Sequence, residues 1–368
     1  MPMRRDQLPP HPTATYVMRR WHAMYISVNK AACTSLKWLV ADLQNERPEK
    51  FAKSLSRELT RTMTVHRRNL WKKTPMAKQL SDEKLATINP EDWFIFAVVR
   101  HPTARLFSAW QSKLLLREPW WVEQFGHEPW FPRVPRNGED VVEDFVRFVR
   151  AAREQPELGI MRNRHFAPQP WMLATDRMEY TRIYKTTEIP QLLQDFERHL
   201  RERRWSGNPL SLRRANETPL KPIPSLFTPE VLEAVSELYA TDFAEFGYSD
   251  PMPTGLDPSD EYGEPQIAEV ERLIERAERI NDLALRGQRL SHALREAQAQ
   301  ARAREAARHR WLKAMRRSAL RAKRRVTGGA EPSGKKLPRA ADGRSQNGLH
   351  AVRKPAPDRE ERAKQPAR

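Results

Sequence analysis

The sequence has a single cysteine, Cys33, no long apolar run and no cluster of residues with metal-ligand spacing. One cysteine cannot form a disulfide within the chain, which is consistent with a reducing compartment. No segment approaches the roughly 18 uncharged apolar residues that a membrane-spanning helix requires. We therefore expect a cytoplasmic protein with no bound metal and no transmembrane segment, and leave peripheral attachment to a membrane open.

Aromatic residues and charge are distributed unequally along the chain. Ten of the eleven tryptophans precede residue 206. Residues 264–368 hold 27 lysines and arginines against 13 aspartates and glutamates, which accounts for +14 of the net charge of +18. The aromatic part can bury a core, whereas the basic part has only one weak apolar stripe at helical spacing, so a weak coiled coil stays open. The predicted divisions are an N-terminal extension (1–21), a folded domain (22–250), a Pro- and Gly-rich linker (251–265), a basic helix (266–326) and a disordered basic tail (327–368).

A first strand, turn and helix is predicted at residues 24–43. Residues 24–28 are a short apolar run, and the small residues that follow open a helix. The first backbone N–H groups of a helix have no partner within it, so those near Ala32 and Cys33 can bind an anion, assisted by the helix dipole. The turn lacks the G-x-x-x-x-G-K-[ST] spacing of a nucleoside triphosphate loop, which argues against a kinase or ATPase.

Three polar side chains accompany this turn. Thr34 and Ser35 add hydroxyl donors at the helix start, and Lys30 follows the strand. An ammonium there could neutralise charge that develops on a phosphorus–sulfur bridging oxygen. A capped helix with a surface lysine explains the same residues equally well.

A second unit of the same kind begins at residue 93. Residues 93–99 are an uncharged apolar run that predicts a central parallel strand. Arg100 follows it, and Ser108 lies two turns into the next helix; together they could bind one phosphate. The carboxyl ends of neighbouring parallel strands are where open α/β sheets bind ligands, although Arg100 alone could equally be a structural ion pair.

These segments resemble a known family. "ISVNKAACTSLKWLVADL" resembles the 5′-phosphosulfate loop of the sulfotransferase family that includes the chondroitin and dermatan sulfotransferases, and "FIFAVVRHPTARLFSAWQSKL" is similar to its 3′-phosphate motif. "NRHFAPQPWML" and "FTPEVLEAVSELYATDFAEFGY" follow in the expected order. The resemblance covers residues 22–248. It implies a P-loop-like α/β core with a central parallel sheet flanked by helices, followed here by the long C-terminal helix and the tail.

The resemblance also implies a donor and its contacts. The donor would be 3′-phosphoadenosine 5′-phosphosulfate (PAPS), with its 5′-phosphosulfate bound by Lys30, Thr34 and Ser35 and its 3′-phosphate bound by Arg100 and Ser108. The chain departs from the familiar animal members, which have a membrane anchor and several cysteines. That leaves the acceptor open, with a carbohydrate implied by the family.

A base must take the proton of the acceptor hydroxyl. His66 is the first candidate, because its ordinary pKa of about 6.5 suits proton abstraction. His165 is the second, or it binds the acceptor or the cofactor, and a glutamate or aspartate base stays open. Trp120 and Trp121 could stack on a sugar, although packing of a loop onto the core is the more common role of such tryptophans. A loop over the donor is predicted from Arg213, Arg214, Asn216 and Lys221.

The interpretation is a PAPS-dependent sulfotransferase acting on a hydroxyl. Two alternatives remain: a polyanion-binding protein without catalytic activity, and a small-molecule kinase. The basic tail could bind an acidic glycan or an anionic membrane surface, with nucleic acid less favoured because nothing in it reads sequence.

Overall fold

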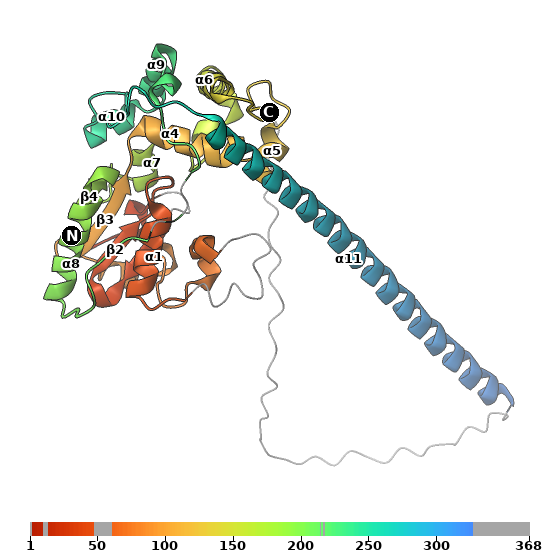
Figure 1. Cartoon of the computed structure of the whole chain (residues 1–368). Helices are drawn as coiled ribbons and strands as arrows, with labels where there is room; N and C mark the ends of the chain where they lie inside the picture. Colours follow the sequence, from red (N-terminus) through yellow and green to blue (C-terminus); the bar gives the residue numbers. More distant parts are fainter. Residues whose placement is uncertain (1, 10–13, 48–60, 214, 216–217, 327–368) are drawn as a thin grey trace, which may run out of the picture. The chain divides into compact units, whose positions relative to one another are not determined.

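The centre of the fold is a four-stranded sheet. The computed structural model describes residues 2–9, 14–47, 61–213, 215 and 218–326. The strands lie in the order β1-β2-β3-β4; β2, β3 and β4 are parallel and β1 is an antiparallel edge strand (Figure 1). The α/β prediction is therefore confirmed, with one antiparallel strand added. The strand bounds are Thr15–Met18 (β1), Ala23–Ile26 (β2), Phe94–Val99 (β3) and Arg182–Lys185 (β4).

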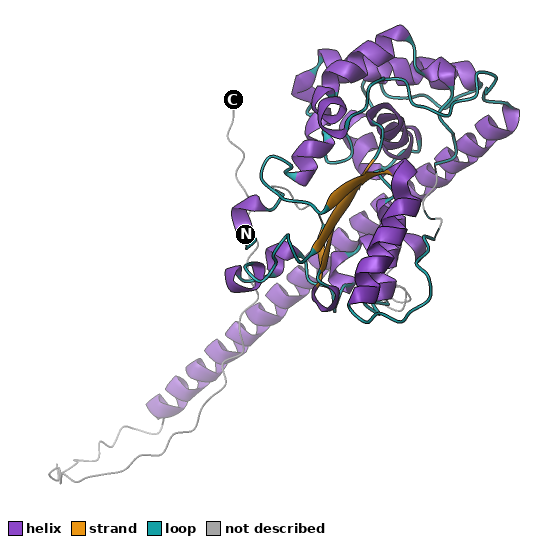
Figure 2. Ribbon diagram, turned by 90° about the vertical axis from the view of Figure 1, so that its left-hand side faces the viewer, coloured by secondary structure: helices purple, strands orange, loops and turns teal. Residues whose placement is uncertain are grey.

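Both faces of the sheet are buried, which explains why β3 is an unbroken apolar run. Alternate residues point to opposite faces, so Phe96 packs with the cluster under α1 and α8, whereas Ile95 packs on the other side with Leu85 and Leu173. Figure 2 shows helices on either side of the sheet. The covering helices are α1 (Cys33–Leu43) and α8 (Ile189–Glu202) on the first face, and α3 (Asp82–Leu85) and α7 (Gln169–Leu173) on the second.

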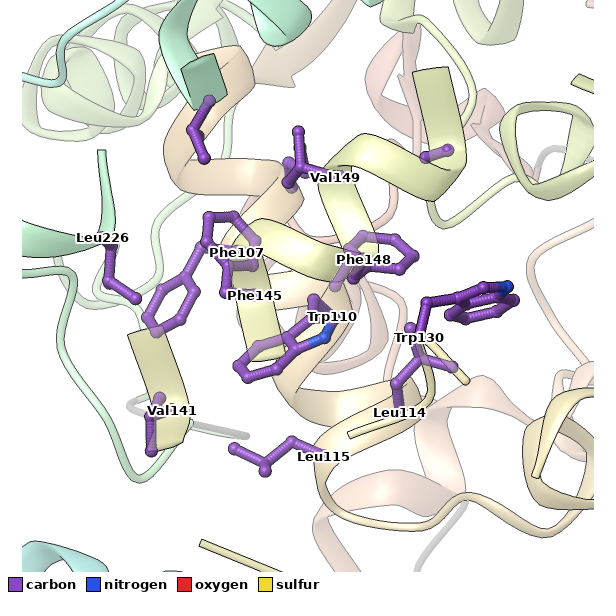
Figure 3. Close-up of a cluster of buried hydrophobic side chains, with 14 of the residues drawn as sticks. Phe107, Trp110, Leu114, Leu115, Trp130, Val141, Phe145, Phe148, Val149 and Leu226 are labelled. Carbon is purple, nitrogen blue, oxygen red and sulfur yellow. The ribbon is translucent and has the colours of Figure 1, made fainter. Parts of the chain in front are cut away.

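A second core lies among helices and the loops between them. Phe107 and Trp110 of α4 meet Phe145 of α6 edge to face, with ring centroids 5.2 and 5.3 Å apart (Figure 3). Such contacts each add about 0.5–1.5 kcal/mol beyond area burial. The helix α4 therefore has one face in this core and its start beside the sheet. The helices of this core are α4 (Pro102–Trp110), its π-helical continuation η6 (Gln111–Leu115), α5 (Pro119–Phe125), α6 (Gly138–Glu154), α9 (Pro229–Leu238) and the first turns of α11 (Glu264–Val326).

Residues 229–246 form two helices, α9 and α10 (Ala240–Phe246), rather than one. Thr228 caps α9 by accepting a hydrogen bond from the N–H of Val231, and Gly247 ends α10 in the left-handed region at φ 61°. Between them Tyr239 leaves the helical conformation, and its hydroxyl donates to the carbonyl of Phe166 at 2.6 Å. A buried tyrosine hydroxyl needs such a partner, which periodicity cannot predict.

Two predicted boundaries are wrong. The extension 1–21 contains β1, which pairs with β2 from Thr15 to Met18. The linker 251–265 packs on the helical core: Thr103 donates to the carbonyl of Pro251 at 2.6 Å, and the Tyr262 hydroxyl donates to that of Lys221 at 2.5 Å. Its Pro and Gly residues end regular structure without ending the packed unit.

The basic helix predicted over 266–326 is confirmed as α11. The chain divides into two compact units within it, Met1–Ser291 and His292–Arg368. In the first unit Ile267, Val270 and Ile274 are buried, whereas in the second Trp311 and Met315 are exposed. Among the described residues, none of the helices combines the length and apolar character needed to cross a bilayer. The predicted tail, 327–368, lies outside the described residues.

Short 3₁₀ segments make up the remaining helical turns. They are η1 (Arg5–Gln7), η2 (Arg19–Trp21), η3 (Arg61–His66), η4 (Arg68–Leu70), η5 (Ala77–Gln79), η7 (Pro156–Leu158), η8 (Ile160–Arg162), η9 (Thr186–Glu188) and η10 (Pro224–Leu226).

Candidate functional site

The turn between β2 and α1 has an unusual backbone. Lys30 and Ala32 both have positive φ, 69° and 54°, in a region that costs a non-glycine residue about 1 kcal/mol or more. Ala32 occupies the N-cap position of α1 and makes no side-chain cap hydrogen bond. The first N–H groups of α1, beginning with that of Cys33, are therefore available to an anion. Left-handed residues in a turn also favour anion-binding concavities of backbone N–H groups.

Lys30 lies in this turn and is largely buried. Its ammonium donates to Ser112 Oγ at 2.9 Å, and Ser112 in turn donates to the carbonyl of Ala109. Burial, followed by the positive charges of Lys113 and Arg100, lowers the pKa of Lys30 to about 8. Arg100 is therefore one of the cations whose charge acts on Lys30.

Arg100 is fixed through its backbone. Gln169 accepts from the N–H of Arg100 at 2.9 Å and donates to its carbonyl at 2.8 Å, and it also donates to buried Asp242 at 2.8 Å. Within the described part of the chain, the Arg100 guanidinium makes no hydrogen bond or ion pair. Burial, then Arg105, lowers its pKa. A largely buried cation without a counterion is costly unless an anionic ligand supplies the partner.

Arg100 lines a cavity of about 580 Å³ at the carboxyl ends of β3 and β4. Lys185, Thr186 and Lys221 also line it. Ser108, predicted to share a phosphate with Arg100, is 6% exposed on α4 and is not among the residues that line this cavity.

Two histidines lie among cations. His66 Nε2 is 2.9 Å from Thr34 Oγ1, and its Nδ1 is 3.1 Å from the ammonium of Lys37. The amide nitrogen of Asn29 is 3.2 Å from Nδ1 of His165 and 3.4 Å from its Nε2, so one amide faces the ring and can bond only one nitrogen well. Both nitrogens of His66 are engaged, whereas His165 retains one without a partner among the described groups.

The electrostatics keep both rings neutral. Burial, then Lys37, lowers the pKa of His66 to about 3. Burial, then Lys113, lowers the pKa of His165 well below its ordinary value. Arg164 acts on both rings in the same direction, and no carboxylate is among the groups that shift either pKa. The site is a concentration of positive charge suited to a ligand with several negative charges.

The tryptophan prediction is half wrong. Trp121 is 2% exposed, with its ring 5.5 Å from that of Phe125 and 5.1 Å from that of Phe166, so it packs in the helical core. Trp120, on the opposite side of α5, is 48% exposed. Adjacent helical residues point about 100° apart, so one of two neighbouring tryptophans is expected to be buried.

The predicted loop over the donor is not supported at its first residue. Arg213 pairs with Asp42 at 2.8 Å and lies over the ring of Trp38, at the far end of α1. Lys221 lines the cavity of Arg100. Arg214 and Asn216 lie outside the described residues.

Several residues of the site were missed from the sequence. Lys37 is 5% exposed although charged, and Arg105 is fully buried, with its guanidinium 3.0 Å from the carbonyl of Asn29. Each is a charge within an apolar helical stretch, a signal that could have been used. Ser112, Lys113 and Gln169 carried no such signal. In the described part of the chain, no group of three or more metal-ligating side chains occurs.

The comparisons with known proteins agree with this geometry. Curated proteins gave no match, and solved structures gave none. A family model described as "Sulfotransferase family" matches residues 14–249, well over half of the chain, and includes β1, the turns after β2 and β3, and Gln169. The match begins at the strand that the sequence analysis assigned to an extension. Because the same residues that form the cationic site lie within it, the chain belongs to the sulfotransferase family and is a transferase.

Proposed function

We propose that the protein transfers a sulfuryl group from PAPS to a hydroxyl of an acceptor, in particular of a carbohydrate or glycoconjugate. The observation that carries the donor assignment is the pair of features that follow the neighbouring parallel strands β2 and β3: the uncapped start of α1 beside Lys30, and the Arg100 guanidinium without a partner among the described residues. A nucleotide with anionic groups at both its 5′ and 3′ positions would place one group at each of these two features.

The residues fit the two ends of this donor. The uncapped start of α1, with Lys30, Thr34 and Ser35, suits the 5′-phosphosulfate. Arg100, which has no protein counterion among the described residues, suits the 3′-phosphate through a bidentate contact. The donor supplies the sulfuryl group. Lys30 supplies positive charge at the oxygen that retains the electrons when the sulfur–oxygen bond breaks.

His165 is the better candidate for the base. The proton that leaves the acceptor hydroxyl needs a nitrogen with a free lone pair, and His66 has both nitrogens in contacts. His165 is neutral and lies among the same cations, and with the Asn29 amide turned so that its oxygen accepts from one ring N–H, the other ring nitrogen keeps a lone pair for the acceptor hydroxyl. A carbohydrate acceptor is supported by the family resemblance and by the exposed ring of Trp120.

Nucleotide preference tests the donor assignment. Calorimetry should give tighter binding for adenosine 3′,5′-bisphosphate than for ATP, because only the former has the 3′-phosphate that Arg100 would bind. Labelled sulfate should then pass from PAPS into polysaccharide or glycolipid of a cell lysate. Equal affinity for ATP would favour a kinase, and no nucleotide binding would favour a polyanion-binding protein.

We propose in addition that the second unit binds an anionic bilayer. Residues 292–326 carry twelve lysines and arginines against two glutamates. Trp311, Leu312 and Met315 are exposed, by 60, 40 and 53%, at spacings that form one face of α11. Basic residues with exposed tryptophan and leucine are typical of helices that lie in a membrane interface, whereas an acidic glycan offers nothing for the apolar face.

Liposome sedimentation tests this surface. The full chain should sediment with phosphatidylserine-containing vesicles and not with neutral ones, and the triple change Trp311→Ser, Leu312→Ser, Met315→Ser should weaken binding roughly tenfold. The control replaces Leu283 and Leu290, which are exposed elsewhere on the helix, by serine. An equal loss of vesicle binding in the control variant would contradict the proposal. So would a full-length protein that binds heparin with an affinity that the triple change does not alter.

A further inference from the structure

We propose that Lys37 and His66 are positioning residues that hold the Thr34 hydroxyl as a hydrogen-bond donor toward the 5′ anionic end of the donor nucleotide. The chain of contacts runs from Lys37 Nζ to His66 Nδ1, 3.1 Å, and from His66 Nε2 to Thr34 Oγ1, 2.9 Å. The inference deepens the proposed function and depends on it only for the identity of the anion.

Lys37 determines which atom donates and which accepts in these two hydrogen bonds. It is 5% exposed in the second turn of α1, and His66 is its hydrogen-bond partner within the described residues. An ammonium has three donors and no acceptor, so His66 Nδ1 must accept. The proton of the neutral ring is then on Nε2. This nitrogen donates to Thr34 Oγ1, and the opposite tautomer would place two N–H groups face to face at Lys37.

Thr34 is left with a proton to donate. Its side chain is 3% exposed, and its oxygen accepts from His66, so its own O–H has no protein acceptor among the described residues. A buried hydroxyl proton without an acceptor is uncommon. Thr34 lies in the first turn of α1, where the uncapped N–H groups also lack acceptors, so one anion there would accept from all of them.

This arrangement assigns His66 a role other than the base predicted from the sequence. A base must present a lone pair to the acceptor hydroxyl, and the lone pair of Nδ1 points to Lys37. The charged groups that act on the ring are Lys30, Lys37, Lys113 and Arg164, all cations, so a proton gained there would be opposed from every side. His66 is suited to transmit a hydrogen bond while remaining neutral.

Nitrogen NMR of His66 tests the arrangement without any assay of activity. In the free protein labelled with ¹⁵N, the ring should carry its proton on Nε2, and Lys37→Met should remove the shift that the ammonium causes at Nδ1. A ring protonated on Nδ1 would overturn the proposal. Since this readout needs no nucleotide, it separates failure of the inference from failure of the proposed function.

Kinetics of matched variants test its consequence. His66→Gln retains one hydrogen-bond acceptor and one donor at a similar separation but provides no base. The two broken variants, His66→Ala and Thr34→Val, each remove a hydrogen bond from the series that joins Lys37, His66 and Thr34. We expect both broken variants to bind adenosine 3′,5′-bisphosphate roughly tenfold more weakly, the effect of one hydrogen bond to a charged group. His66→Gln should stay within about threefold of the wild type in kcat and keep its pH profile. The control is His127→Gln, on an exposed side chain.

Two results would count against the proposal, and a third would count against the donor assignment alone. If His66→Gln lost kcat by about 10²-fold or more with nucleotide binding unchanged, His66 would be the base. If the broken variants bound nucleotide normally while their thermal unfolding was unchanged, Thr34 would not contact the anion. If the wild type bound no adenosine 3′,5′-bisphosphate although the NMR result held, the positioning pair would serve another anion and the donor assignment would fail.

Discussion

Replacing Lys30 by alanine is expected to lower kcat by roughly 10²–10³-fold, the usual effect of removing one group that stabilises charge in the transition state. Binding of adenosine 3′,5′-bisphosphate should change much less, because the backbone N–H groups at the start of α1 remain. Steady-state kinetics and calorimetry on the same preparation check both. An equal loss in binding and turnover would show that Lys30 acts in ground-state binding alone.

The pH profile tests the charge of the same residue. Burial and neighbouring cations lower the pKa of Lys30 to about 8, so the ammonium is present below that pH in the free enzyme and is lost above it. The wild-type kcat/KM should therefore fall above about pH 8. Lys30→Arg should retain part of the activity and lose this alkaline fall, because a guanidinium stays protonated. A fall that persists in the arginine variant belongs to another group.

Replacing Arg100 by alanine is expected to weaken binding of adenosine 3′,5′-bisphosphate by roughly 10- to 100-fold, the value of a bidentate charge-assisted contact. Adenosine 5′-monophosphate, which lacks the 3′-phosphate, should bind the variant and the wild type alike. The fold should survive, because Gln169 and Asp242 hold residue 100 through its backbone rather than its side chain.

Two comparisons make this result specific. Arg198→Ala removes an exposed arginine of α8 and should leave both nucleotides unaffected. If Arg100→Ala weakened both nucleotides equally, the guanidinium would support the site as a whole and the 3′-phosphate assignment would be wrong.

Local patterns predicted most of the core. The apolar runs before residues 29 and 100 are strands β2 and β3. A strand that is buried on both faces is apolar at successive positions, so it can be predicted from an unbroken apolar run. Strand β1 was missed because its four residues lie between proline-rich and arginine-rich stretches, and its pairing with β2 is a contact that periodicity does not encode. The Pro-rich segment after residue 250 was misread for the same reason, since composition reports flexibility but not packing.

Within the site, the residues adjacent to the two turns were predictable from the sequence. The residues that hold them in place through hydrogen bonds were not. Lys30 and Arg100 follow strands whose carboxyl ends share an edge, a rule that holds without coordinates. The contacts of Gln169 with Arg100 and of Lys37 with His66 join residues 69 and 29 positions apart in the sequence, and only tertiary packing brings them together. The same packing buried Trp121 and left Trp120 to solvent.

Helix α4 and its continuation η6 connect the two ends of the site. The helix starts two residues after Arg100, and Ser112 in η6 receives the hydrogen bond of Lys30, so one rod of about 15 Å runs from one cation to the other. The side of α4 that faces away from the sheet packs against aromatic rings, so the length of this helix is fixed. In the proposed function this fixed length would select among nucleotides: one whose negative groups are spaced differently would contact Lys30 or Arg100, but not both.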